Sequence, residues 1–359
     1  MAIHHVSRRS FQVTATALAA LGAALTVGMA HAQTAPAMPD ADMKMVLDAQ
    51  ASLKGKPIET LTPAEARKQP TVTDGVNRVL KAENQSIKPQ VLVPGVSSKD
   101  IMIPGAAGQL PARVFTPAGR GPFPVVVYFH GGGWVIADKQ VYDGGARTLA
   151  KNTKAVVVSV DYRRAPEAKF PAQWDDALAA YKWTAANAVQ LKGDPTRLAL
   201  AGESAGGNLA VATAIAARDA GLPKPAIVLS VYPVAQTSTD TASYNTYADA
   251  KPLNRPMIKW FVDNLTNSPA DLKDPRLQLI DANLAGLPPV VIINAQIDPL
   301  LDDGSLLETA LRKANVPVER KVYDGATHEF FGTAAVVQKA RDAQAFAADR
   351  MKAAFGTGM

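Results

Sequence analysis

The chain has 359 residues, of which 47% are hydrophobic and 19% are charged, and it contains no cysteine. This composition excludes a disordered, a fibrous and a disulfide-stapled protein. The formal charge of +6 is mild, and it is not gathered into lysine and arginine blocks interleaved with aromatic residues, so the composition also argues against a nucleic-acid-binding role.

The first 32 residues have the pattern of an export signal, which makes 1–32 a separate segment. Arg8 and Arg9 precede an uncharged, alanine-rich run, and Ala30-His31-Ala32 is the small-x-small pattern of a signal-peptidase site. The arginine pair resembles the bacterial twin-arginine (Tat) signal, a sequence that directs proteins to export after folding. We therefore expect cleavage after Ala32, the Tat export machinery as a partner, and a periplasmic or secreted protein. The alternative, an uncleaved anchor helix, is disfavoured by the weak hydrophobicity of the run, so we expect no stable membrane span in the mature form.

The remaining chain has the element pattern of an α/β protein. Residues 33–95 contain short helical patterns interrupted by prolines. An alternating hairpin over 98–117 follows, and then come apolar runs rich in valine and isoleucine, at 123–129, 155–160, 197–201 and 226–234. Helical patterns separate these runs. Buried runs that alternate with helices predict a mostly parallel sheet with helices on both faces.

The pattern is interrupted once and then resumes. Residues 236–288 are polar and rich in proline, with one amphipathic stretch, NRPMIKWFVDNL. Sheet and helix patterns return with PPVVIINAQ at 288–296, and a last strand and a C-terminal helix follow. An insertion that returns to the same sheet is typical of a lid over a site rather than of a second domain. We therefore expect one catalytic domain over 96–359.

The sequence Gly202-Glu203-Ser204-Ala205-Gly206 lies between the 197–201 run and a helical pattern, with no intervening loop. A GxSxG between a strand and a helix is the nucleophile elbow, in which glycines relieve a strained turn and the serine hydroxyl is exposed. The following helix begins at Ala205, so its amide N–H is placed to face a developing oxyanion. The alternative is a corner where small residues only pack.

A serine nucleophile needs a base, and the sequence offers few. The histidines are His4, His5, His31, His130 and His328. Cleavage removes the first three. His328 follows the last strand and comes after Ser204 in the chain, as the elbow motif requires, so we predict that it is the general base.

An acid is expected at the end of a strand between the serine and the histidine. Asp298 directly follows the resumed strand, at the carboxyl edge of the predicted sheet. There it would hold the imidazole in its reactive tautomer. Asp302 and Asp303 are the alternatives, but they stand at a helix start, where aspartates are commonly caps.

The triglycine segment His130-Gly131-Gly132-Gly133-Trp134 follows the 123–129 run. Its backbone amides can approach a negative oxygen, and HGGG completes the oxyanion hole of lipases and esterases. A phosphate-binding loop fits poorly, because the Walker ending and the GxGxxG spacing are missing. We expect His130 to fix this loop by a hydrogen bond, and the scarcity of histidine and cysteine argues against a metal site.

Six segments in order resemble the bacterial hormone-sensitive-lipase family of α/β-hydrolase esterases: HGGGW, VDYRRAPE, FPAQWDDALAAYKW, GESAGGNLA, DPLLDDG and YDGATHEFF. The resemblance covers residues 95–355. It implies hydrolysis of carboxylic esters through an acyl-enzyme, no cofactor, and a cap built from the 33–95 segment together with the insertion. The residues that it implies for catalysis are Ser204, Asp298 and His328 for the triad and Gly131, Gly132 and Ala205 for the oxyanion hole.

The chain departs from the family pattern at three places. Glu203 stands where many relatives have Asp or Thr, His328-Glu329-Phe330 replaces His-Gly-Phe, and DPRLQLID replaces a Ser-Pro-Leu segment. Three charged residues of VDYRRAPE are expected to orient their neighbours: Asp161, Arg163 and Glu167. The candidates for the substrate pocket, each with a core role as the alternative, are Trp134, Glu203, Trp260, Phe261 and Phe331.

The sequence therefore predicts an exported serine carboxylesterase that acts on short-chain, small-molecule esters. One alternative is an amide or peptide hydrolase that uses the same triad. Another is a non-catalytic ligand-binding protein of the same fold. The oligomeric state stays open, with a homodimer among the outcomes.

Overall fold

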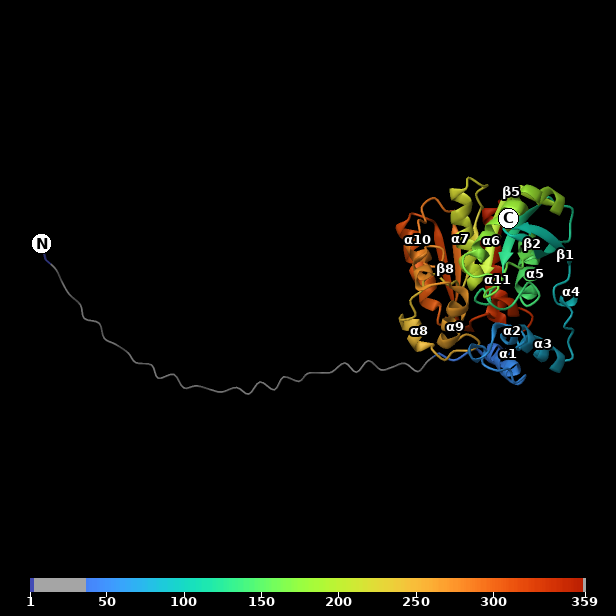
Figure 1. Ribbon diagram of the computed structural model, residues 1–359, viewed down its shortest axis with the longest axis horizontal. Helices are drawn as coiled ribbons and strands as arrows, with labels where there is room; N and C mark the ends of the chain where they lie inside the picture. Colours follow the sequence, from blue (N-terminus) through green and yellow to red (C-terminus); the bar gives the residue numbers. More distant parts are fainter. Residues whose placement is uncertain (3–36, 358–359) are drawn as a thin grey trace. The chain divides into compact units, whose positions relative to one another are not determined.

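A computed structural model describes residues 1–2 and 37–357 of the chain. The predicted export signal and its cleavage site lie outside the described residues. Figure 1 shows a central sheet between two layers of helices. The strands are β1 (Val96–Gly105), β2 (Gly108–Pro117), β3 (Phe123–Phe129), β4 (Val156–Val160), β5 (Gly193–Glu203), β6 (Val228–Val231), β7 (Val290–Ile297) and β8 (Val318–Thr327).

The eight strands form one sheet in the order β1-β2-β4-β3-β5-β6-β7-β8. The predicted hairpin is confirmed as β1 and β2, which pair antiparallel, and β2 also pairs antiparallel with β4. From β4 to β8 every pairing is parallel. The predicted α/β class is therefore confirmed, and all parallel strands place their carboxyl ends at one edge of the sheet.

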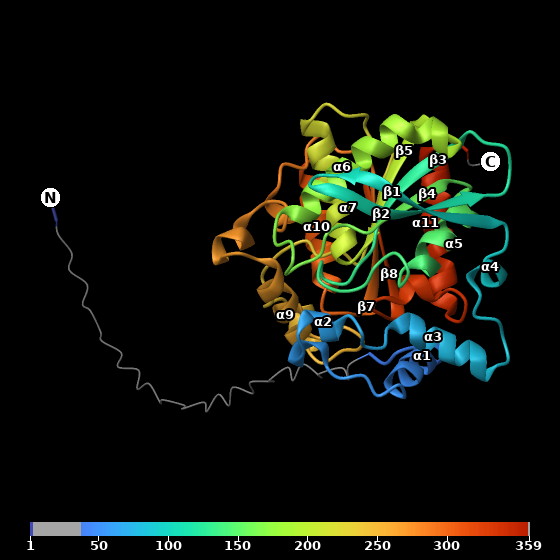
Figure 2. The same cartoon turned by 45° about the vertical axis from the view of Figure 1, so that its right-hand side comes forward.

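Helices cover both faces of the sheet, as predicted. The longer helices of this domain are α5 (Asp143–Thr153), α6 (Ala172–Asn187), α7 (Ala205–Asp219), α10 (Leu301–Lys313) and α11 (Gln338–Ala354). Apolar residues of α6, α7 and α10 pack in one hydrophobic cluster, and those of α5 and α11 pack in the other, with the sheet between them (Figure 2). Alternate residues of β3 face opposite clusters, because successive side chains of a strand point to opposite faces.

The 33–95 segment contains two helices that the sequence analysis missed. It folds into α1 (Ala41–Ala51), α2 (Pro63–Ala66), α3 (Val72–Ala82) and α4 (Pro89–Leu92), with the 3-10 turn η1 (Ile58–Thr60). The missed helices are α3 and α4, although Thr71 and Asp74 form a capping box before the apolar face of α3. In Figures 1 and 2, α2 is the blue helix that lies nearest to α9 (Arg255–Leu265) of the insertion.

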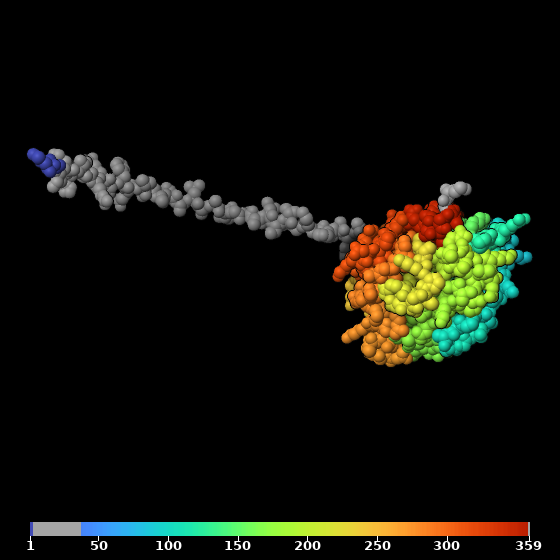
Figure 3. Space-filling view, turned by 90° about the horizontal axis from the view of Figure 1, so that it is seen from above, coloured from blue at the N-terminus to red at the C-terminus, as the bar shows by residue number. Residues whose placement is uncertain are grey.

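The insertion between β6 and β7 also contains α8 (Ala242–Thr246) and the short 3-10 turns η3 (Pro269–Lys273) and η4 (Leu279–Asp281). Two hydrogen bonds join it to the N-terminal segment, from Trp260 Nε1 to the carbonyl of Leu61 and from Asn254 Nδ2 to Glu59 Oε1. Figure 3 views the domain from above, where green, yellow, orange and red segments form most of the surface. Among the described residues no helix is both long and apolar enough to cross a membrane.

Candidate active site

Ser204 stands at the turn between β5 and α7, with a left-handed φ of 58°. The turn depends on its two glycines. A Cβ on Gly202 would lie 2.1 Å from the carbonyl oxygen of Gly206, and a Cβ on Gly206 would lie 2.0 Å from that of Phe129. The serine amide donates to the carbonyl of Val231 at 2.8 Å, which ties the turn to the neighbouring strand. These contacts with the surrounding chain enforce the strained backbone conformation, which holds the Ser204 hydroxyl in one place.

The structure brings Ser204, His328 and Asp298 together. His328 follows β8, and its Nε2 lies 3.0 Å from Ser204 Oγ. Its Nδ1 lies 2.7 Å from Oδ2 of Asp298, which directly follows β7. All three residues are buried. The geometry allows Asp298 to hold the Nδ1 proton, which leaves Nε2 free to accept the serine proton.

The charges around His328 favour its protonated form. Burial alone lowers the pKa of this imidazole, but the charge and hydrogen bond of Asp298 act in the opposite direction, as do the charges of Glu329 and Glu203. Together they raise the pKa of His328 above its ordinary value. The base is neutral only above this pKa, so a reaction that needs it is lost as the pH falls through a value higher than about 6.5.

The two alternative acids hold the insertion instead of contacting His328. Asp303 Oδ2 accepts from the amide of Ala235 and its Oδ1 from Gln236 Nε2, while Asp302 Oδ2 accepts from the amide of Ser243. Neither side chain caps α10, so the capping role expected from the sequence was wrong. The helix begins earlier than that prediction required, at Leu301, and both carboxylates turn toward the insertion.

The triglycine loop lies against the serine turn. A Cβ on Gly131 would lie 2.3 Å from the hydroxyl of Tyr142 and 3.0 Å from the carbonyl oxygen of Glu203, so only glycine fits. Within the described residues, the amide N–H groups of Gly131, Gly132 and Ala205 donate to no protein acceptor. The His130 ring stacks on Tyr162, and its Nδ1 lies 2.8 Å from the Gly131 carbonyl. Burial lowers the pKa of His130, which keeps this ring neutral.

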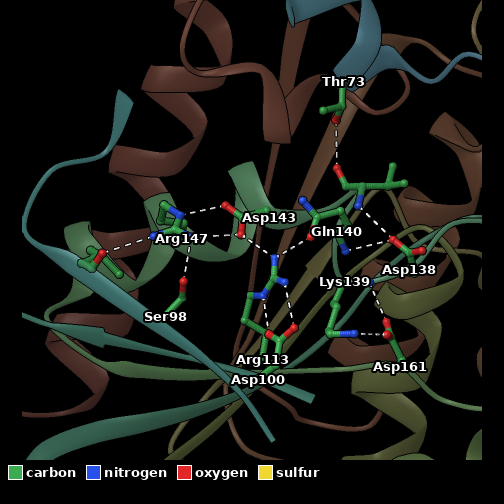
Figure 4. A network of polar contacts seen from close by, with 12 residues as sticks. Thr73, Ser98, Asp100, Arg113, Asp138, Lys139, Gln140, Asp143, Arg147 and Asp161 are labelled. Atoms are coloured by element: carbon green, nitrogen blue, oxygen red, sulfur yellow. Dashed lines mark hydrogen bonds and ion pairs between the residues drawn. The ribbon is translucent and has the colours of Figure 1, made fainter. Parts of the chain in front are cut away.

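A charged network holds the segment that continues this loop toward α5 (Figure 4). Asp161 accepts from both the amide and the Nζ of Lys139, each at 2.6 Å. Arg113 of β2 contacts Asp100, Gln140 and Asp143, and Figure 4 shows its guanidinium between them. The loop is thus fixed at its far end by the hairpin and by the segment after β4.

The other charged residues of the VDYRRAPE segment also bind other elements. Arg163 binds Asp176 of α6, with its Nε 2.7 Å from Oδ2. Glu167 pairs with Arg67 from the N-terminal segment at 2.6 Å. These contacts are of the orienting kind that the sequence analysis expected for this segment.

Two cavities flank the site. The first, of about 40 Å³, lies beside Ser204 and has an apolar lining from the triglycine loop and from the insertion, including α9. The second, of about 680 Å³, lies between the N-terminal helices and the insertion. Its wall includes Ile297, Thr327 and Glu329, which lie beside the acid and the base in sequence. Of the five candidate pocket residues, Trp134 and Phe261 line the first cavity.

The other three candidates line neither cavity. Trp260 turns toward Leu61, Phe331 is fully buried in the core, and Glu203 is buried beneath the serine turn. Successive residues of a helix or a strand point in different directions. Trp260 and Glu203, which precede Phe261 and Ser204 in sequence, therefore face away from the substrate space.

Glu203 is bound by two tyrosines that the sequence analysis did not select. Its Oε1 accepts from Tyr128 OH at the end of β3, and its Oε2 accepts from Tyr232 OH after β6. Burial raises the pKa of Glu203 to about 7, although the two phenols lower it. Each tyrosine is a polar residue in an otherwise apolar strand run, and this signal could have identified both of them.

Comparisons with known proteins agree with this geometry. Residues 126–332 match the family described as alpha/beta hydrolase fold. The chain is 39% identical over 281 residues to the carboxylesterase NlhH of Mycobacterium tuberculosis, which covers 76% of this chain and 88% of that protein. It is 33% identical over 237 residues to an ethyl acetate hydrolase of Pseudomonas putida, covering 64% of this chain and 74% of that protein. The crystal structure of a thermostable esterase from Pseudomonas putida ECU1011 superposes with a TM-score of 0.80 at 31% identity, over 90% of this chain and 99% of that one.

Proposed function

This chain belongs to the α/β-hydrolase fold family and, within it, to the hormone-sensitive-lipase type of esterases, and it is a carboxylic ester hydrolase. From this premise we propose that it hydrolyses short-chain esters with Ser204 as nucleophile, His328 as general base and Asp298 as the orienting acid. The continuous hydrogen-bond chain from Ser204 Oγ through His328 to Asp298, placed on a strained turn, carries the proposal. Hydrolysis of p-nitrophenyl butyrate by the full chain, and its dependence on Ser204, tests it.

The chemistry follows from the positions of these atoms. His328 Nε2 takes the Ser204 proton as Oγ attacks the ester carbon, and the amides of Gly131, Gly132 and Ala205 receive the oxyanion. The imidazolium then gives its proton to the departing alkoxide, which leaves an acyl group on Ser204. A water molecule loses a proton to His328 and attacks this acyl group, and the returned proton releases the carboxylic acid and restores the serine.

We assign the two halves of the ester to the two cavities. His328 must protonate the leaving oxygen, so the alcohol lies on the side where Thr327 and Glu329 line the larger cavity. The acyl group then occupies the apolar cavity beside Ser204 and Trp134. The segments that enclose both cavities, the 33–95 helices and the 236–288 insertion, form the proposed cap.

Phe261 sets the length of the acyl group in this proposal. Its ring lies so close to Gly133 that a Cβ on that glycine would be 2.2 Å from it. We expect Phe261→Ala to raise kcat/KM for p-nitrophenyl octanoate relative to butyrate by about tenfold or more, because each further buried methylene contributes about 0.8 kcal/mol.

Trp260→Ala is the matched control for this substitution. It truncates an aromatic side chain on the same helix, and this side chain lines neither cavity. The acyl-length profile of Trp260→Ala should therefore stay that of the unmodified chain. An equal change of profile in both variants would show that loosening of α9, rather than opening of the cavity, is responsible.

Export through the Tat pathway, with cleavage after Ala32, is proposed from the leader sequence. The double substitution Arg8→Lys and Arg9→Lys keeps both charges but removes the arginine pair. In a bacterial host we expect it to retain the leader and to leave the esterase activity in the cytoplasm, whereas the unmodified chain yields a mature protein that begins at Gln33. Mass spectrometry of fractionated cells measures both, and periplasmic activity of the lysine variant would contradict the proposal.

A further inference from the structure

The residue after the proposed base also presents a carboxylate to this site. Glu329 takes a left-handed φ of 63° between β8 and the 3-10 turn η5 (Phe330–Thr333). Its Oε1 accepts from the hydroxyl of Tyr142 at 3.2 Å. The same hydroxyl rests against Gly131 in the triglycine loop. Glu329 therefore connects the base to the loop whose amides face the oxyanion.

Glu203 presents a second carboxylate from another side of His328. Its carboxyl group joins Tyr128 and Tyr232 across three neighbouring strand ends, β3, β5 and β6. The Tyr232 ring also packs on the His328 imidazole, with 4.5 Å between the ring centroids. Tyr232 thus links Glu203 to the imidazole, and Glu329 directly follows His328 in the chain.

The cluster contains more acidic groups than basic groups. Burial raises the pKa of both glutamates. The charge of Glu329 also raises the pKa of Glu203, the charge of Asp298 also raises the pKa of Glu329, and His328 lowers the pKa of both. A negative charge held next to an imidazole in a poorly hydrated site stabilises the imidazolium. Asp298 already does this through a hydrogen bond, whereas the two glutamates act through space.

Other charged groups face the cluster from the elements around it. The charged residues that share the wall of the larger cavity with Glu329 are Lys44, Asp48, Lys56, Glu59, Arg67, Asp138, Arg164 and Lys251. Arg67 is paired with Glu167, and Lys44 is paired with Asp48. On α5, which packs against η5, Asp143 and Arg147 pair with each other, and on α11 the contact is the neutral Gln344. His328 is the positive charge that lowers the pKa of both glutamates.

We propose that Glu203 and Glu329 form an acid pair around His328 that stabilises the imidazolium formed during turnover and sets the lower pH limit of the enzyme. Both are positioning residues, because neither touches the reacting atoms. The inference rests on the proposed function, since it needs His328 to be the base. It assigns a role to a residue at two of the three places where this sequence departs from the family pattern.

Glu329→Gln tests the charge while keeping an amide oxygen that can accept from Tyr142. Removal of the negative charge lowers the pKa of His328, so the neutral base persists to lower pH. We expect the acidic midpoint of kcat/KM, which lies above about 6.5 in the unmodified chain, to fall by about one pH unit. The plateau kcat should fall by about tenfold at most, because a pKa change of one unit corresponds to a tenfold change in imidazolium stability. Titration of the His328 ring by NMR measures the same shift directly.

Two further variants separate charge from structure. Glu329→Asp keeps the charge, so its midpoint should stay near that of the unmodified chain. Glu308→Gln removes a carboxylate that is bound to Arg312 and Arg320 away from the site, and it should leave the profile unchanged. Glu203→Gln should lower the midpoint in the same direction as Glu329→Gln but by less, because burial raises the pKa of Glu203 to about 7 and its carboxyl is partly neutral near that midpoint.

An unchanged midpoint of kcat/KM in Glu329→Gln overturns this inference, provided that thermal unfolding of the variant is cooperative and thus shows that it is folded. An equal shift in Glu329→Gln and Glu329→Asp also overturns it, because shape and not charge would then be responsible. Either result leaves the proposed function standing as long as hydrolysis still requires Ser204. Hydrolysis that survives Ser204→Ala would instead remove the proposed function on which the inference rests.

Discussion

Ser204→Ala is expected to abolish ester hydrolysis, with a fall in kcat of more than about 10⁴-fold. The substitution removes only the hydroxyl group, and without this nucleophile no acyl-enzyme forms. The amides around the oxyanion site remain in place. Hydrolysis of p-nitrophenyl acetate and butyrate measures the loss. A fluorophosphonate probe should label the peptide that contains Ser204 in the unmodified chain and should fail to label the variant.

The matched control is Ser159→Ala. Ser159 is fully buried in β4, and its hydroxyl has no hydrogen-bond partner among the described residues, so its removal should leave both activity and labelling intact. Undiminished hydrolysis by Ser204→Ala would disprove the proposed mechanism. Parallel assays with p-nitroanilides show whether the same serine also cleaves amides, which is the alternative that the sequence left open.

Asp298→Asn is expected to lower kcat by about 10⁴-fold with little change in folding, because it forces the wrong tautomer on His328. Oδ1 of Asp298 accepts from the amide of Leu300 at 2.9 Å, while Oδ2 faces His328 Nδ1 at 2.7 Å. In the variant, the single amide oxygen must remain with Leu300, and the NH₂ group then faces Nδ1. The imidazole proton moves to Nε2 and points at Ser204, so the ring can no longer accept the serine proton.

Asp303→Asn is the control for this experiment. Asp303 is a buried acid near the same strand end, and its carboxylate binds the insertion rather than His328. Burial raises the pKa of Asp303 to about 8, so asparagine resembles the form that it adopts at neutral pH. We expect a much smaller loss of kcat in Asp303→Asn than in Asp298→Asn. The reverse order would assign the triad acid to Asp303.

The pattern of apolar and helical segments in the sequence is sufficient to predict the architecture. Apolar runs that alternate with helices specify a parallel sheet, because only a buried strand remains apolar on both faces. The strand predicted at 226–234 was too long, since Tyr232 takes a left-handed φ of 34° and leaves the sheet after Val231. A sequence pattern does not contain such a local change of direction, after which the Tyr232 hydroxyl binds Glu203.

The sequence by itself determined the fold class and the identity of the nucleophile, base and acid candidates, because motif context and chain order leave few choices for each. Only the tertiary structure decided which aromatic side chains face the cavities, since α9 points Phe261 toward Ser204 and Trp260 away from it. Only the structure placed Glu203 and Glu329 around the same imidazole. Glu203 lies at the end of β5, and Glu329 follows β8. The two residues are far apart in sequence, but they lie at the same edge of the sheet because parallel strands place their carboxyl ends there.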